Sequence, residues 1–106
     1  MNDQELLTLA AKAAGYKLSF YNGYAVNVTD FHPAQNVHGA KQWNPLTDDG
    51  DALRLAVKLC LWVHMGTYHV AIESYAIEEI VDLNDRYAAT RRAIVRAAAA
   101  IGKEQP

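Results

Sequence analysis

The dipeptide Asn22-Gly23 separates two runs of β-prone residues, 16–21 and 24–28. A two-residue type I′ turn needs positive φ at both central positions, which Asn and Gly tolerate better than other residues. The pattern therefore predicts a tight hairpin with strands at 16–21 and 24–28. A hairpin implies an antiparallel sheet, and helices must cover the apolar face of that sheet.

The first segment with helical periodicity precedes this hairpin and spans residues 3–14. Asn2 and Glu5 form a capping-box arrangement at its start. Gly15 stands where a left-handed residue that ends the helix is favoured. The predicted apolar face consists of Leu6, Leu9, Ala10 and Ala13.

A second helix is predicted from about 48 to 60. Its polar strip is narrow, consisting of Asp51, Arg54 and Lys58, so we expect this helix to be the most enclosed of the three. Cys60 is the only cysteine, which excludes an intramolecular disulfide and zinc sites built on several thiolates. We interpret it as a small buried hydrophobe.

The third helix is predicted from about 85 to 101. Asn84 or Asp85 caps its start and Gly102 ends it. The small residues 97–100 allow it to approach a partner helix closely. Its predicted core stripe consists of Tyr87, Ile94, Ala98 and Ile101.

Between the second and third helices, residues 61–65 and 68–73 read as another hairpin, and 75–81 as a further strand. An irregular loop is expected at about 29–47. The order is α-β-β-α-β-β-(β)-α. The prediction is a single small α+β domain over residues 1–106, in which an antiparallel sheet of about four to five strands packs with three helices.

Composition narrows the classes of partner. The chain of 106 residues has 21% charged residues and a net charge of −2, so no global basic field indicates nucleic acid. No apolar run approaches the roughly 20 residues that span a bilayer. The polar start Asn2 to Glu5 is unlike a secretory signal, so we expect a cytosolic location.

Three carboxylates, Asp48, Asp49 and Asp51, stand at the start of the second helix. Carboxylates are stabilising there because the first N–H groups lack partners. Asp48 as N-cap, with Asp51 three positions on, is a variant of the capping box. A divalent-cation site and an acidic patch facing a partner remain alternatives, although the spacing departs from a calcium loop.

The residues just before these carboxylates are Trp43, Asn44 and Pro45. Pro45 favours an extended Asn44 and so stiffens the turn into the helix. Trp43 either plugs the core beside the helix start or contacts a partner, since tryptophan is common at interface hot spots.

The four histidines are His32, His38, His64 and His69. None forms a His-x3-His pair, so no metal site is predicted. His64 and His69 flank a turn and are placed to face each other. His32 and His38 are candidate binding residues because they lie in the irregular loop, and such loops are often functional.

The third helix carries Arg91, Arg92 and Arg96. One interpretation is a solvated face, and the other is binding to phosphate or to an acidic partner. The acidic run that includes Glu73, Glu78 and Glu79 either neutralises these arginines within the fold or offers an acidic surface.

No catalytic signature is visible. Ser19 and Ser74 do not lie in a nucleophile elbow, and no Gly-rich phosphate loop is present. The sequence therefore predicts neither an enzyme nor a cofactor.

The blocks from Trp43 to Leu59 and from Asp85 to Gly102 resemble the phage αβα-sandwich domain family of small phage and prophage proteins. The resemblance implies that fold and a phage setting in the bacterial host cytoplasm, without catalytic residues to carry over. We expect an accessory protein that binds a host or phage macromolecule, an anti-defence inhibitor being one such role, or that self-associates. The alternative is a protein that binds and sequesters a small ligand or nucleotide as an oligomer.

Overall fold

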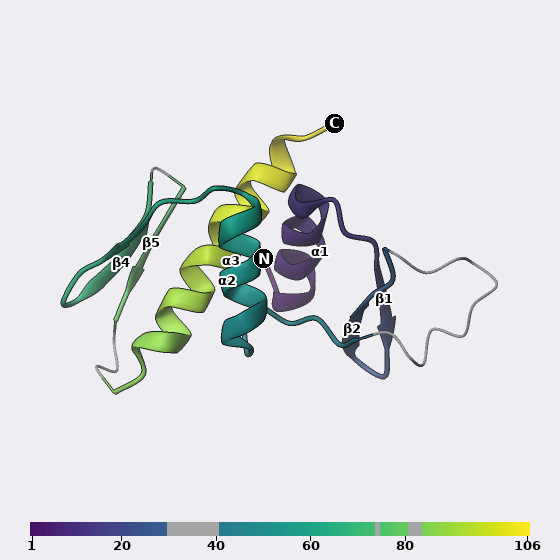
Figure 1. Ribbon diagram of the computed structural model, residues 1–106, viewed down its shortest axis with the longest axis horizontal. Coiled ribbons are helices and arrows are strands. Elements are labelled where there is room, and N and C mark those ends of the chain that lie inside the picture. Colours follow the sequence, from purple (N-terminus) through teal and green to yellow (C-terminus); the bar gives the residue numbers. More distant parts are fainter. Residues whose placement is uncertain (30–40, 74, 81–83) are drawn as a thin grey trace.

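The computed structural model describes residues 1–29, 41–73, 75–80 and 84–106. Within these ranges three helices and two antiparallel sheets confirm the predicted α+β class (Figure 1). The elements follow the predicted order. They are α1 (Asp3–Ala14), β1 (Leu18–Tyr21), β2 (Tyr24–Asn27), α2 (Asp49–Lys58), β3 (Val63–Met65), β4 (His69–Ile72), β5 (Ala76–Glu79) and α3 (Arg86–Glu104).

The strands form two separate sheets, where the sequence predicted one. One sheet pairs β1 with β2, and the other has the order β3-β4-β5. Figure 1 shows the helices in the middle, with the two-stranded ribbon on one side and the three-stranded sheet on the other. The two sheets stay apart because α1 and α3 pack directly on each other between them.

The first hairpin has the predicted turn. Asn22 and Gly23 adopt φ values of 50° and 85°, and Tyr21 pairs with Tyr24 across the turn. Residues 41–47, the last part of the predicted loop, begin beside this ribbon. The backbone N–H of Trp43 donates to the Ala25 carbonyl of β2 at 2.9 Å. This pairing places the start of the 43–59 segment against β2.

Side-chain caps begin all three helices. The Asn2 Oδ1 accepts from Glu5 N at 2.8 Å, Asp48 Oδ2 accepts from Asp51 N at 2.8 Å, and Asp85 Oδ1 accepts from Ala88 N at 3.0 Å. Gly15 ends α1 at φ 79°, as predicted. These caps were predictable because each joins residues three apart in the sequence.

Gly102 does not end α3, contrary to the prediction. The helix continues to Glu104, and Gly102 is buried where α3 crosses α1. A Cβ at this position would lie 2.0 Å from the backbone oxygen of Leu9. The glycine is therefore needed for the close approach of two backbones, together with the buried alanines 97–99.

The second helix is less enclosed than predicted. Leu55 is fully buried, but Leu53 and Val57 are 64% and 67% exposed. Cys60 is exposed rather than buried, because the helix ends at Lys58 and Cys60 adopts a left-handed φ of 54° beyond it. The wide apolar arc of α2 thus faces the core on one side and solvent on the other.

The predicted core stripe of α3 is partly correct. Ile94 and Ala98 are buried, Ile101 is half-buried, and Tyr87 is 68% exposed. Tyr87 lies in the first turn of α3 and on the rim of the groove between α2 and β3, where no described element covers its ring. The helix rests on β4 and β5 farther along, against the fully buried Val70 and Ile72.

Candidate binding groove

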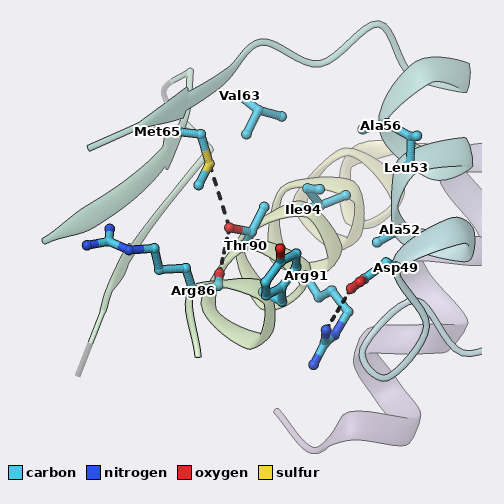
Figure 2. Close-up of a pocket in the computed structure, with 11 residues that line it drawn as sticks. Asp49, Ala52, Leu53, Ala56, Val63, Met65, Arg86, Thr90, Arg91 and Ile94 are labelled. Carbon is cyan, nitrogen blue, oxygen red and sulfur yellow. Dashed lines mark hydrogen bonds and ion pairs between the residues drawn. The ribbon is translucent and has the colours of Figure 1, made fainter. Parts of the chain in front are cut away.

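A groove separates α2 from β3, and α3 forms its floor (Figure 2). Figure 2 shows Val63 and Met65 on one side and Leu53 and Ala56 on the other. The groove has a volume of about 520 Å³. Its lining is mainly apolar and consists of Asp49, Ala52, Leu53, Ala56, Val63, Met65, Arg86, Tyr87, Thr90, Arg91 and Ile94.

The groove follows from how the sheet sits on the helices. α3 packs against both α2 and the strands β4 and β5, whereas β3 is the free edge strand on the side of α2. The buried side chains of Ala52, Ala56 and Ile94 close its base. Because Ala52 and Ala56 are small, α2 leaves space beside β3.

Large apolar side chains stand exposed along the groove. Leu53 is 64% exposed, Met65 56% and Tyr87 68%. Single exposed apolar residues are ordinary, but a contiguous concave set is typical of an interaction site. These residues thus form the main candidate contact surface in the described part of the chain.

Two polar side chains of the groove, Arg91 and Thr90, already have partners within the fold. The Arg91 guanidinium donates to Asp49 Oδ1 at 2.7 Å and to the Leu46 carbonyl at 2.8 Å. The Thr90 hydroxyl donates to the Arg86 carbonyl at 2.8 Å. These bonds fix the rim and leave apolar contact as the main means of recognition.

Trp43 lies in the core and not on a binding surface. Its side chain is 5% exposed, and its ring meets the Tyr16 ring edge-on at 5.8 Å between centroids. The ammonium of Lys58 lies 4.4 Å from the centroid of Tyr16, over the outer side of this pair. The core role is therefore the one the structure supports.

Asn44, Pro45, Asp48 and Asp51 build the entry to α2. Asp51 is 5% exposed, and its carboxylate accepts from Asn44 N at 3.0 Å and from Arg54 at 2.8 Å. The predicted capping box is thus modified, because Asp51 reaches back to Asn44 and not to the N-cap residue. Pro45 is fully buried beside this network.

The same network affects Arg54. The hydrogen bond to Asp51, and then the charges of Asp51 and Asp48, raise the pKa of the Arg54 guanidinium above its usual value. Because the folded-state pKa of Arg54 is raised, the charged form of Arg54 stabilises the fold at pH values below that pKa. The titration of Arg54 removes that stabilisation only when the pH rises through the raised pKa, well above neutrality. Arg54 therefore keeps its charge throughout the usual pH range.

The three candidate arginines do not form one binding face. Arg91 pairs with Asp49 in α2, Arg92 with Asp3 in α1, and Arg96 with Glu78 in β5. The alternative in which acidic residues neutralise the arginines within the fold is confirmed for Arg96 and Glu78, at 2.6 Å. The pairs instead tie α3 to three other elements.

The histidines are not brought together in the described part of the chain. His32 and His38 lie outside the described residues. The register pairs His64 with Ala71 and His69 with Glu79, so His64 and His69 are not cross-strand neighbours. Among the described residues, no three His, Cys, Asp or Glu side chains gather as a metal site would require.

The groove residues Leu53, Met65 and Tyr87 were not predicted as a site. The available signal was the apolar surface of α2, which is wider than one buried face needs. The exposed pair Leu53 and Val57 stands four residues apart on it. The contribution of β3 depends on tertiary packing, which periodicity does not report.

Comparisons with models of known protein families, with curated proteins and with solved structures find no match for this chain. Among its described helices, none combines the length and apolar character needed to cross a membrane.

Proposed function

We propose that this protein is a non-enzymatic accessory protein of phage or prophage origin that binds another protein in the host cytoplasm. The observation that carries the proposal is the apolar groove between α2 and β3, with Leu53, Met65 and Tyr87 exposed along it. Contiguous exposed apolar surfaces are typical of protein–protein interfaces and of ligand-binding grooves. The phage setting comes from the resemblance of residues 43–59 and 85–102.

The groove favours a protein partner over a phosphorylated small ligand. A phosphate site needs cationic donors aimed into the cavity, but the Arg91 guanidinium is held by Asp49 and by the Leu46 carbonyl. The Arg86 guanidinium points away from Leu53 and Ala56 and donates to the carbonyls of Gly66 and Thr67, beyond the end of β3 (Figure 2). Arg92 and Arg96 each pair with a carboxylate of another element. Sequestration of a nucleotide would require breaking these pairs.

The test is an affinity capture from bacterial lysate with matched variants. Leu53→Asp places a carboxylate in the groove at an exposed position, so the fold is retained while apolar recognition is lost. Tyr24→Asp is the control, because Tyr24 is 58% exposed on the ribbon across the molecule. We expect the wild type and the control to retain the same protein, and Leu53→Asp to lose it.

The opposite pattern would contradict the proposal. Equal capture by Leu53→Asp and the wild type would place the contact elsewhere. A thermal-shift screen with nucleotides tests the alternative, because a ligand that binds only the folded state raises Tm. A clear rise would favour the small-ligand function.

A further inference from the structure

β3 is an edge strand, and the backbone N–H and C=O groups of Val63 and Met65 point away from β4. These groups have no hydrogen-bond partner among the described residues. The Gly66 N–H donates to the His69 carbonyl at 2.8 Å, so Gly66 and His69 form a hydrogen-bonded pair. Bonded and non-bonded pairs alternate along an antiparallel ladder. The register places Met65 opposite Val70 and Val63 opposite Ile72, so the backbone groups of Met65 and Val63 point away from β4.

α2, the helix on the β3 side of the sheet, is not covered by the sheet. β4 and β5 lie on α3, and α2 packs beside α3. Packed helices lie about 8–10 Å apart and paired strands about 4.8 Å apart. Two strand spacings from β4 equal about one spacing between packed helices. β3 occupies the first of these two strand positions. A strand added at the second position would lie over α2, in the groove.

We infer that the groove binds an extended segment of the partner protein as an added strand beside β3. This inference rests on the proposed function and names the form of its partner. A strand at this position would bond to the outward backbone groups of Val63 and Met65. Its side chains on the helix side, at every second position, would cover the exposed Leu53 and reach the groove base at Ile94.

A partner helix fits the same groove less well. It would exclude water from the outward N–H and C=O groups of Val63 and Met65 without bonding to them. Leaving such groups buried and unpaired is costly. The extended segment satisfies both requirements of the site, apolar cover for α2 and hydrogen bonds for the edge.

Charge complementarity indicates one further property of the segment. Arg86 lines the groove and donates to the carbonyls of Gly66 and Thr67, just past the Met65 end of β3. No carboxylate among the described residues pairs with it. The bound segment therefore carries an acidic residue at the end that lies beside Gly66.

The test starts with a displayed library of random linear peptides about ten residues long, the upper length of common strands. We expect selected peptides to alternate apolar residues and to carry a carboxylate at one end. Amide hydrogen exchange of the full chain, with and without a selected peptide, then reads the edge. The amides of Val63 and Met65 should slow at least tenfold, and that of His64, already facing β4, should not.

A second arm tests the carboxylate. Arg86→Gln and a Glu→Gln change in the peptide should each weaken binding about five- to tenfold, and the double change should cost no more than either alone. Additive losses would overturn the pairing with Arg86. As a control, Arg92→Gln, at a site outside the groove, should leave peptide affinity unchanged.

Several outcomes would overturn the added strand. Peptides with apolar residues spaced three and four apart would indicate a helix instead. Protection of Val63 and Met65 that grows with protein concentration, without peptide, would identify a second copy as the occupant. Failure to select any groove-binding peptide would also contradict the strand, whereas lysate capture that depends on Leu53 would still support the proposed function.

Discussion

At the scale of single residues, Gly102 has the strictest requirement in the described structure. In Gly102→Ala the new Cβ would meet the Leu9 carbonyl at 2.0 Å, so α1 and α3 must separate. We expect the free energy of unfolding to fall by about 3 kcal/mol, as overpacked sites do. Urea denaturation monitored by circular dichroism measures it.

Gly50→Ala provides the matched control for Gly102→Ala. Gly50 is also helical, but its Cβ would meet only side-chain atoms, the Arg54 guanidinium at 3.0 Å and the Asp48 carboxylate at 3.2 Å. These side chains can shift, and alanine favours a helix over glycine by up to about 1 kcal/mol, so Gly50→Ala should cost much less than Gly102→Ala. Equal losses at both glycines would contradict the tight crossing at Gly102.

Asp51 is the second residue with a large predicted effect. Asp51→Ala removes the acceptor for Asn44 N and for Arg54, leaving the turn into α2 unsupported. We expect a loss of about 2 kcal/mol in urea denaturation. Asp49→Ala, two residues earlier in the same turn, removes an exposed carboxylate paired with Arg91 and should cost less than about 1 kcal/mol.

The sequence predicted residue roles well where the cause is local. The caps at Asn2, Asp48 and Asp85 depend on the neighbouring turn alone, and all three are confirmed. The partners of Arg92 and Arg96 depend on which elements meet in the fold. Spacing along one helix carries no such information, so an arginine face was expected where separate ion pairs exist.

At the scale of elements, α2 has one buried and one exposed apolar face. We expect Leu55→Ala to cost about 2–5 kcal/mol, because Leu55 is fully buried. Leu53→Ser, at a position 64% exposed, should change the free energy of unfolding by less than about 0.5 kcal/mol. Urea denaturation of the two variants checks this, and a large loss for Leu53→Ser would mean that the groove wall is buried.

Element types were predictable because their signals are strong and short-range. The Asn22-Gly23 turn and the second hairpin are both present, and the further strand is confirmed as β5. The prediction that α2 is the most enclosed helix was wrong. Periodicity shows where apolar residues lie along a helix but not which of them another element covers. Beyond the end of α2, Cys60 adopts the left-handed conformation that glycine usually supplies, so no glycine in the sequence marks this helix end.

At the scale of the whole molecule, the two tryptophans report on opposite sides of the helices. Trp43 is 5% exposed behind the ribbon, whereas Trp62 is 70% exposed beside β3. Iodide should therefore quench Trp62 fluorescence several times more strongly than Trp43 fluorescence. Trp62→Phe and Trp43→Phe separate the two signals, and equal quenching would contradict this placement.

The separation of the two sheets was not predictable from the strand pattern. Alternation identifies strands but does not state which hairpins join one sheet. The outcome depends on the glycine and alanines that let α3 pack on α1, and their effect appears only when both helices are placed together. The groove arises from the same arrangement, because the sheet over α3 stops at β3.

The central claim is that the groove between α2 and β3 holds a partner protein. Photocrosslinking in bacterial cells tests it most directly, with a benzoyl-phenylalanine at position 87 on the groove rim and another at position 24 on the ribbon. We predict that the crosslinker at position 87 captures one discrete protein and that Leu53→Asp abolishes this adduct. The crosslinker at position 24 should not capture that protein. The same adducts from both positions, or an adduct at position 87 that Leu53→Asp leaves unchanged, would contradict the claim.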